Sequence, residues 1–502
     1  MSAAVESVSL SAPVRSFVGR PHQALIGGRW QNARAGGTFE VFNPATEEVI
    51  AHVADCQAAD VDLAVAAARK AFDEGPWPSL SPSQRGRILW KIGDLILENL
   101  EELAQLEALD NGKPISVARA ADVPLAADLF HYMAGWATKL EGNTIPLSVP
   151  YTPDAQYHAY TRREPIGVVA QIIPWNFPLL MAAWKLGPVL TAGCTVVLKP
   201  AEETPLSALR LAQLCLDAGL PPGVLNVLTG FGETCGAPLA AHPGVDKVAF
   251  TGSTEVGKLI VKAAAKDLKK VTLELGGKSP NIVLDDADLD LAIPGASSAI
   301  FFNHGQCCCA GSRLFVQEKR YDRVLEGVSD AAKKIRLGPG LDPSTEMGPL
   351  VSKVQFERVS GFLKSGTEEG ARTVSGGQRH GKAGYFVQPT VLDGTRESMK
   401  VYQEEIFGPV VTVMPFKDVD ADLIRRANDT VYGLAAGIWT ANMKRAHRIA
   451  NQLRAGTVWI NCYNIFDAAL PFGGYKQSGW GREMGHEVLK NYLETKAICM
   501  SI

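Results

Sequence analysis

The first third of the chain carries a helical pattern of apolar positions. Between residues 60 and 140, apolar side chains recur mostly every three or four residues, as at Val61 and Ala64 and again at Leu89, Ile92 and Ile96. This spacing gathers apolar side chains on one face of a helix. The pattern therefore predicts amphipathic helices over this part of the chain.

From residue 167 the pattern changes to short apolar runs that alternate with helical segments. Each run predicts a buried strand, and alternation at this pace predicts parallel sheets with right-handed crossovers. A first series contains VVAQII, TVVLKP, VLNVLTG, KVAFTG and KKVTLELGG, and a second, from residue 281 to about 458, contains NIVL, RLFV, PVVTVMPF, GLAAGIWT and TVWIN. Two α/β units in succession predict a cleft between them.

One uncharged stretch has the length of a membrane span. It runs from Ile166 to Trp184 but contains Pro174, Asn176 and Pro178. Two prolines four residues apart would break a membrane helix in the middle. The stretch instead predicts a buried strand over residues 167–173, a tight turn, and a helix that starts near Pro178.

Length and charge narrow the class of protein. The chain has 502 residues, enough for two or three domains with at least one large core. Its 50 Lys and Arg against 53 Asp and Glu give a net charge of −3, which leaves no basic field for nucleic acid or an anionic membrane. With 46% hydrophobic and 21% charged residues, collagen, coiled-coil and disordered classes are excluded.

The nine cysteines favour a reducing compartment. They are irregularly spaced and form no C-x-x-C pair, so a disulfide framework is not expected. We therefore expect a cytoplasmic location. The N-terminus lacks the basic start and apolar run of a secretory signal, although its serines and two arginines faintly resemble an organelle transit peptide. We interpret residues 1–21 as a disordered arm.

Two glycine-rich segments follow predicted strands. The segment from Gly230 to Gly236 places its third glycine one residue too late for a dinucleotide fingerprint. The segment from Gly252 to Lys258 matches a P-loop up to its lysine, but Leu259 stands where Ser or Thr must hold Mg²⁺. What remains is a strand-to-helix turn in which Ser253 and free backbone N–H groups suit an anion such as a pyrophosphate. A purely structural turn is the alternative.

A lysine and a carboxylate end another predicted strand. Lys199 and Glu202 follow the run TVVL. A carboxylate beyond a sheet strand commonly binds the adenosine ribose hydroxyls and repels a 2′-phosphate, which would favour NAD over NADP. An exposed ion pair between the two residues is the alternative.

Three adjacent thiols form the strongest chemical signal. Cys307, Cys308 and Cys309 lie in an apolar stretch closed by small residues. Consecutive cysteines cannot all face one ion, so a zinc cluster with His304 is not expected. Three interpretations remain open: a redox nucleophile, a cysteine hydrolase in which His304 and Cys308 share a helical face, and buried inert thiols.

A carboxylate beside two glycines supplies a second candidate. Glu274 ends the run VTLE just before Gly276 and Gly277, where backbone can approach a ligand closely. Glu274 could act as a general base. A salt bridge to Lys278 is the alternative.

Taken together, these segments resemble the NAD(P)-dependent aldehyde dehydrogenase family over nearly the whole chain. The motifs that carry the resemblance are PWNFP from Pro174, KPAE from Lys199, FTGSTEVG from Phe250, LELGGKSP from Leu273, FFNHGQCCCAGSR from Phe301, EEIFGPV from Glu404 and PFGGYKQSG from Pro471. Their joint occurrence in order favours the functional interpretation of the turn, the carboxylates and the thiol.

The resemblance implies an α/β fold with a Rossmann-type NAD-binding domain, a catalytic α/β domain and a small β oligomerisation arm. The expected boundaries are 22–145 with 165–276 for the NAD-binding domain, 277–478 for the catalytic domain, and 146–164 with 479–502 for the arm. A homo-oligomer, either a dimer or a tetramer, would then join neighbours through the β-prone tail TKAICMSI.

The resemblance also implies roles for individual residues. Cys308 matches the nucleophile, Glu274 the general base and Asn176 the amide that supports the oxyanion; His304 matches no family role. The cofactor would be NAD, and no metal is expected. Matching cofactor positions are Ile173, Pro174, Trp175, Lys199, Glu202, Gly232, Gly252, Ser253, Gly257, Leu275, Gln355, Glu405 and Phe407, of which Gln355 lies in a looser sequence context.

Nine positions would line the substrate tunnel. Five are aromatic and none is charged, so the tunnel would favour burial of an apolar substrate and would leave the charge of a charged substrate unpaired. We therefore expect a hydrophobic, arylalkyl aldehyde such as phenylacetaldehyde, with medium-chain aliphatic aldehydes as the alternative. The positions are Phe177, Leu180, Met181, Trp184, Phe302, Cys307, Cys309, Phe466 and Phe472.

Overall fold

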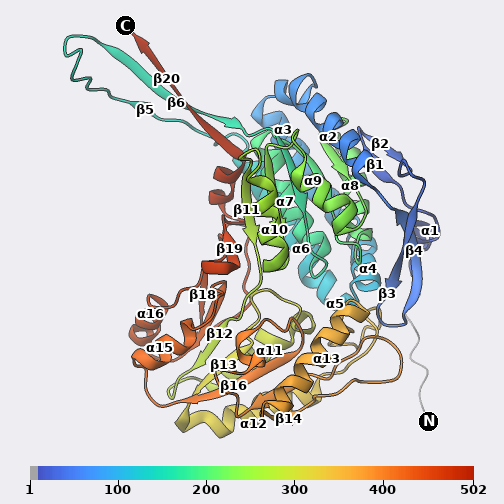
Figure 1. Cartoon of the computed structure of the whole chain (residues 1–502), viewed down its shortest axis with the longest axis vertical. Helices are drawn as coiled ribbons and strands as arrows, with labels where there is room; N and C mark the ends of the chain where they lie inside the picture. Colours follow the sequence, from blue (N-terminus) through green and yellow to red (C-terminus); the bar gives the residue numbers. More distant parts are fainter. Residues whose placement is uncertain (1–9) are drawn as a thin grey trace.

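The computed structural model describes residues 10–502, so the prediction for residues 1–9 lies outside the described residues. The chain forms two α/β units, each built around its own sheet, and a separate β arm that projects from the molecule (Figure 1). The mixed α/β architecture predicted from the alternating strands and helices is confirmed.

An eight-stranded sheet forms the first unit, in the order β19-β11-β10-β7-β8-β9-β1-β2. Its five central strands from β11 to β9 are parallel, as predicted. The carboxyl ends of parallel strands meet at one edge, so the loops after β7, β8, β10 and β11 lie together. The strands are β1 Ala24–Ile26, β2 Arg29–Gln31, β7 Val168–Ile172, β8 Thr195–Lys199, β9 Leu225–Val227, β10 Lys247–Thr251, β11 Lys270–Glu274 and β19 Gly479–Trp480.

Helices pack around this sheet, and those between residues 60 and 140 confirm the prediction from the apolar spacing. They include α2 Ala58–Asp73, α3 Pro82–Glu98, α4 Leu100–Asp110, α5 Ile115–Val117, α6 Val123–Trp136, α7 Pro178–Ala192, α8 Leu206–Asp217, α9 Ala237–Ala241 and α10 Thr254–Ala264. The uncharged stretch forms β7, a turn and the wholly buried helix α7, as predicted. Across residues 10–502, no helix combines the length and apolar character needed to cross a membrane.

The second unit has a seven-stranded sheet in the order β14-β15-β16-β13-β12-β17-β18. Its strands are β12 Pro280–Val283, β13 Arg313–Gln317, β14 Arg372–Ser375, β15 Thr390–Asp393, β16 Val410–Phe416, β17 Ala435–Trp439 and β18 Thr457–Ile460. Its helices are α11 Leu289–Phe301, α12 Tyr321–Lys334, α13 Lys353–Glu368, α14 Lys400–Gln403, α15 Ala421–Asn428 and α16 Met443–Ala450. All pairs except β14 with β15 are parallel.

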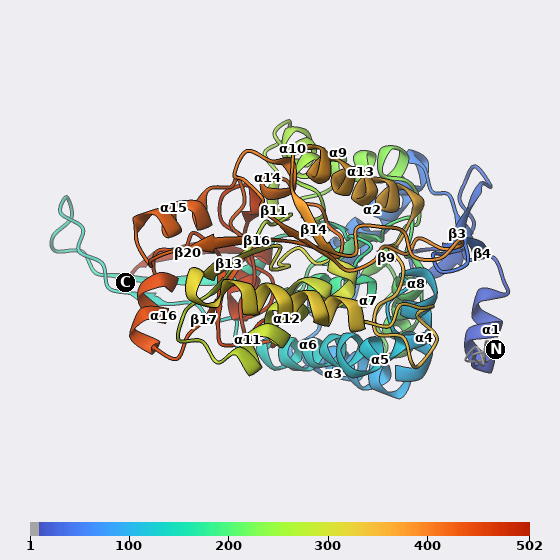
Figure 2. The same ribbon diagram turned by 90° about the horizontal axis from the view of Figure 1, so that it is seen from below.

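The arm is a three-stranded antiparallel sheet of β5 Thr144–Ile145, β6 Tyr157–Pro165 and β20 Leu493–Ser501. It projects away from both units, and the described N-terminal end lies at the opposite end of the molecule (Figures 1 and 2). The arm starts later than the predicted residue 479, because β19 pairs with β11 and residues 486–492 form a 3₁₀ helix. A further two-stranded ribbon pairs β3 Thr38–Asn43 with β4 Glu48–Ala54.

Part of the predicted disordered arm is folded. Residues Ala12–Val18 form the helix α1, with Pro13 in its first turn and Val14 and Phe17 buried against the core. The prediction of disorder is therefore wrong for this part of 1–21, because two apolar side chains three residues apart give the segment a face to bury.

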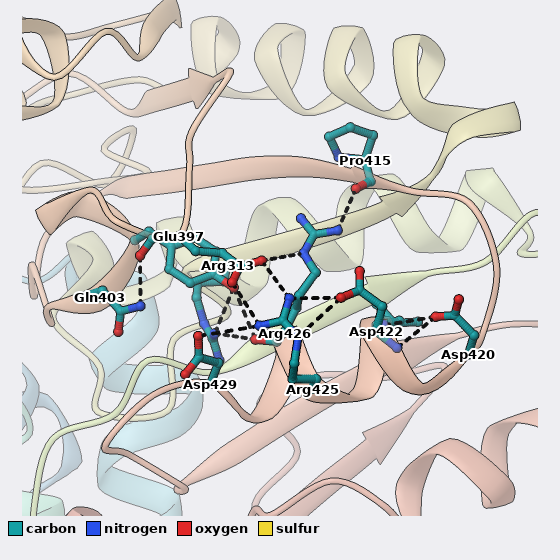
Figure 3. Close-up of polar contacts among 11 residues, drawn as sticks. Arg313, Glu397, Gln403, Pro415, Asp420, Asp422, Arg425, Arg426 and Asp429 are labelled. Atoms are coloured by element: carbon teal, nitrogen blue, oxygen red, sulfur yellow. Dashed lines mark hydrogen bonds and ion pairs between the residues drawn. The ribbon is translucent and has the colours of Figure 1, made fainter.

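A buried arginine anchors the strand that follows the three thiols. Arg313 at the start of β13 is fully buried and donates hydrogen bonds to the carbonyl oxygens of Lys278 (2.9 Å), Arg426 (3.0 Å) and Ala427 (2.7 Å). Figure 3 shows that Arg426 in turn pairs with Glu397 (3.2 Å). The guanidinium thus joins the thiol segment, the segment after Glu274 and the end of α15.

Candidate active site

One cavity of about 470 Å³ gathers most of the predicted site. All three predicted catalytic residues and all nine predicted tunnel residues line it. Eight predicted cofactor residues line it too: Pro174, Trp175, Gly252, Ser253, Leu275, Gln355, Glu405 and Phe407. Five predicted cofactor residues lie outside its lining: Ile173, Lys199, Glu202, Gly232 and Gly257.

The thiols lie in a loop that a left-handed turn redirects. Helix α11 ends at Phe301, and Asn303, His304 and Gly305 then adopt φ of 49°, 59° and 68°. A side chain on Gly305 would place Cβ 2.0 Å from the carbonyl oxygen of Gly408, so only glycine fits there. The turn ends the helix before the thiols begin.

This turn contradicts the helical arrangement needed for a hydrolase pair. His304 and Cys308 do not share a helical face, and His304 is buried outside the cavity lining. Burial, together with the nearby Lys113 ammonium, lowers the pKa of His304 to about 3. A neutral, buried imidazole of this kind is a poor acceptor for the Cys308 proton.

Among the three thiols, only Cys308 is partly exposed. Cys307 and Cys309 are buried, with their Sγ atoms 3.4 Å apart. Contacts with Cys307 and Cys309, followed by burial, raise the pKa of Cys308 above its usual range. The accessible thiol is therefore protonated at neutral pH and needs a base to become a nucleophile.

Glu274 is a buried carboxyl at the end of β11. Burial, and then repulsion from Glu483, raises its pKa well above the usual range, while Lys185 and Arg482 oppose the shift. The alternative interpretation, a salt bridge to Lys278, is wrong, because no such pair forms within residues 10–502. A carboxyl with a raised pKa in a cavity has the properties of a general base.

Asn176 lies in the loop between β7 and α7. Its side chain is almost fully buried, and Nδ2 donates a hydrogen bond to the carbonyl oxygen of Gln306 (3.0 Å). Gln306 directly precedes the thiols, so the amide donor of Asn176 lies against the thiol loop. Two segments about 130 residues apart in the chain thereby form one site.

The turn after β10 is shaped by its glycines. Ser253 caps α10, and its Oγ accepts a hydrogen bond from the backbone N–H of Val256 (3.2 Å). A Cβ on Gly252 would lie 2.5 Å from the Phe250 ring, and one on Gly257 would lie 2.8 Å from Leu275. The glycines therefore keep the helix N-terminus and its backbone N–H groups close to the cavity.

Lys199 and Glu202 form an ion pair, but not an exposed one. The ammonium of Lys199 lies 3.2 Å from Glu202 Oε2, and the lysine is only 2% exposed while the glutamate is half-buried. Ile173 also lies here, with its backbone N–H bound to the carbonyl oxygen of Lys199 (3.1 Å). Gly232 starts a short π-helical turn, and no atom lies within 4 Å of the position of an added Cβ.

Glu405 and Phe407 bring the second unit to the cavity. Glu405 Oε1 accepts a hydrogen bond from the backbone N–H of Gly277 (2.9 Å). Phe407 has a φ of 59° and meets the ring of Trp175 edge-on at 5.2 Å. Gln355 Nε2 donates to the carbonyl oxygen of Phe407 (2.7 Å), which fixes this segment.

Five aromatic rings among the predicted tunnel residues line the cavity. Phe466 and Phe472 lie 5.6 Å apart, Trp184 lies 5.6 Å from Phe472, and Phe177 stacks on Phe302 at 6.1 Å. These rings form the aromatic part of the lining.

The cavity also contains residues that the sequence analysis missed. Asp122 adds a carboxylate to a lining that was expected to be uncharged, although Lys113 pairs with it. Segment 121–125 belongs to a helical region with no chemical motif, whereas Tyr463 and Asn464 lie three and two residues before the predicted Phe466. The missed residues are Ala121, Asp122, Leu125, Thr251, Gly276, Ser298, Arg358, Tyr463 and Asn464.

Known proteins are similar to this chain over nearly its whole length. Residues 30–498 match the aldehyde dehydrogenase family. The chain belongs to this family. It is 54% identical to DhaS of Bacillus subtilis over 496 residues, which is 99% of each chain. It is also 50% identical to the mitochondrial benzaldehyde dehydrogenase of Antirrhinum majus, covering 99% of this chain and 92% of that one.

A solved structure has the same fold. The NAD⁺ complex of an aldehyde dehydrogenase from Bacillus cereus superposes with a TM-score of 0.97 at 52% identity, covering 99% of this chain and 100% of that one. The predicted aldehyde dehydrogenase fold is therefore confirmed.

Proposed function

We propose that the chain oxidises a hydrophobic aldehyde to its carboxylic acid with NAD, through a thioester on Cys308. The observation that carries this proposal is that Cys308, Glu274 and Asn176 line one cavity together with eight predicted cofactor residues and a group of aromatic side chains. A nucleophile, a base and an oxyanion donor in one cavity form the constellation that aldehyde oxidation requires.

The predicted cofactor residues of the lining fit NAD. A helix N-terminus held close by Gly252 suits a pyrophosphate, and Glu405 and Phe407 line the same cavity. Lys199 and Glu202 end the strand next to β7, where ribose hydroxyls are commonly bound. Family membership and the Bacillus cereus complex also support this assignment. When bound, NAD would accept the hydride that leaves the aldehyde carbon.

The residues of the chain supply the remaining chemistry. The Cys308 thiol first loses its proton to solvent water, and the resulting thiolate attacks the aldehyde carbon. The oxyanion that forms is held by the Asn176 amide and the backbone N–H of Cys308. Loss of hydride from this thiohemiacetal leaves a thioester on Cys308. Glu274 then takes a proton from water, whose oxygen attacks the thioester carbonyl, and the acid departs as the thiol is restored.

Cofactor choice should depend on the carboxylate of Glu202. We expect NAD to be preferred over NADP by at least about tenfold, or roughly 1.4 kcal/mol, because the carboxylate repels a 2′-phosphate. Glu202→Gln should lower the ratio of kcat/KM with NAD to kcat/KM with NADP. Steady-state kinetics with each cofactor measures this ratio. An unchanged ratio would show that the charge of Glu202 is not the cause.

Activity should rise as the pH rises from 6 to 8. The reactive forms of Cys308 and Glu274 are deprotonated, and both groups have a raised pKa, so protonation suppresses kcat/KM at the acidic end. Below the controlling pKa, kcat/KM should increase about tenfold per pH unit. A pH profile of kcat/KM that falls between pH 6 and 8 would contradict this assignment.

The substrate that fits the aromatic part of the lining best is an arylalkyl aldehyde such as phenylacetaldehyde, with medium-chain aliphatic aldehydes as the alternative. The rings of Phe177, Trp184, Phe466 and Phe472 favour the burial of an apolar or aromatic group of the substrate. The carboxylate of Asp122 is paired with Lys113 and is therefore not free to bind a cationic substrate. The similarity to a benzaldehyde dehydrogenase, whose name gives an aromatic aldehyde, supports a substrate with an aromatic ring.

A substrate panel tests this proposal. NAD reduction is followed with phenylacetaldehyde, benzaldehyde, hexanal, betaine aldehyde and succinic semialdehyde. We expect kcat/KM to be highest for phenylacetaldehyde. The highest kcat/KM for either charged aldehyde would overturn the apolar assignment, whereas no turnover of any aldehyde would overturn the activity itself.

A homo-oligomer in the cytoplasm completes the proposal. Strand β20 is an edge strand of the arm, and the arm exposes Ile145, Leu147 and Met500. An unpaired apolar edge is suited to a neighbouring subunit, which would give a dimer or a tetramer. The nine cysteines are all free, as in a reducing compartment.

A further inference from the structure

A fully buried asparagine supports the loop that carries Asn176. Asn111 follows α4, and its Nδ2 donates to the carbonyl oxygen of Trp175 (2.8 Å) and lies 3.4 Å from that of Asn176. The carbonyl oxygen of Asn176 also accepts from Asn303 Nδ2 (2.9 Å). The backbone carbonyl groups on both sides of Asn176 therefore lie against one amide from another segment of the chain.

A carboxylate one turn earlier in α4 binds the far side of the same loop. Glu107 Oε1 accepts hydrogen bonds from the backbone N–H of Leu179 (3.0 Å) and from Ser207 Oγ (2.5 Å). Leu179 lies in the first turn of α7, whose N-cap residue Phe177 offers no side-chain cap. Glu107 thus supplies both the missing acceptor and a negative charge at the positive end of α7.

A lysine holds this carboxylate in place. The Lys113 ammonium lies 3.3 Å from Glu107 Oε2, pairs with Asp122, and lies 4.6 Å from the centre of the Phe177 ring. Glu107, Lys113 and Asp122 are at most 1% exposed. Buried charges are costly unless they are paired, so each of these groups restricts the position of the others.

We infer that Glu107, Asn111, Lys113 and Asp122, here called the α4 cluster, form a positioning device for the oxyanion donor. The cluster holds the loop of Asn176 at both ends and keeps its Nδ2 aimed at the thiol loop. Asn111 acts through Asn176 and is a positioning residue. The inference rests on the proposed function, because it assumes that Asn176 holds the oxyanion.

A double-mutant cycle tests this inference. Asn111→Leu removes the amide donor at similar volume, and Asn176→Ala removes the oxyanion donor. In the otherwise unchanged enzyme, Asn111→Leu should lower kcat at least about tenfold, because a small displacement of an aligned hydrogen-bond donor strongly lowers the rate of the chemical step. In the Asn176→Ala background the same change should lower kcat by less than about twofold, because residues that act as a unit are not additive.

Asn226→Leu is the matched control. Asn226 is also fully buried and donates to two backbone carbonyl oxygens, those of Val196 (3.3 Å) and Gly223 (2.9 Å), outside the cavity. It should lower Tm but leave kcat within about twofold. The rate of Cys308 alkylation by iodoacetamide should change less than about twofold in Asn111→Leu, which separates donor placement from damage to the thiol.

Two outcomes would overturn the inference. The first is a kcat loss from Asn111→Leu that is equally large in the Asn176→Ala background. The second is a kcat loss no larger than that of Asn226→Leu. If Asn111→Leu is insoluble, Asn111→Ser, whose short hydroxyl cannot reach both carbonyl oxygens, replaces it in the same cycle. Failure of the proposed function is distinguishable, because Asn176→Ala alone would then leave kcat unchanged.

Discussion

Cys308→Ala should reduce kcat for aldehyde oxidation by at least about 10⁴-fold, because Cys308 is the one partly exposed thiol of the three that line the cavity. Cys307→Ala and Cys309→Ala should each lower kcat less than about tenfold, since these thiols are buried and contribute packing. NAD-linked turnover of phenylacetaldehyde by the three variants measures this difference.

His304→Ala serves as a further control in this series. Because His304 is buried outside the cavity lining, its loss should affect Tm more than turnover. Aldehyde turnover that persists in Cys308→Ala would show that Cys308 is not the nucleophile. Thioesterase activity that needs His304 but no NAD would favour the hydrolase instead.

Asn176→Ala should lower kcat about 10²–10³-fold, the usual cost of removing one oxyanion donor. The KM for NAD should stay within about twofold, because the effect falls on the transition state of the chemical step. Steady-state kinetics with varied NAD and aldehyde separates the two parameters.

Asn176→Asp is the matched variant for this prediction. It keeps the size and shape of the side chain but replaces the donor with an acceptor, and a negative charge would repel the oxyanion. We expect kcat to fall at least as far as in Asn176→Ala. Near-normal kcat in Asn176→Asp would show that Asn176 shapes the loop without stabilising charge.

The two sheets and most of the lining could be predicted from the sequence because their signals are local. Strand and helix periodicity fixed β7, its turn and α7 within a residue or two, since Pro174 and Pro178 interrupt the stretch. The cysteine, glutamate and asparagine of the site lie in motifs at strand or helix ends. Parallel pairing then brings such ends together at one edge of the sheet.

Other features depend on packing between distant segments, which periodicity does not report. Asp122 lines the cavity from a helical region without any motif, and its charge is cancelled by Lys113. The turn at Asn303 and His304 was missed because non-glycine residues rarely adopt positive φ. The helix α1 was missed because two buried side chains in a short segment give a weak pattern.

Trapping the covalent intermediate tests the central claim most directly. Glu274→Gln should slow hydrolysis of the thioester while leaving the thiol and the oxyanion donor in place. After this variant is mixed with NAD and phenylacetaldehyde and quenched in acid, peptide mass spectrometry should find a phenylacetyl group on Cys308, formed only when NAD is present. An acyl group on Cys307 or Cys309, or continued turnover with no acylated cysteine, would contradict the account.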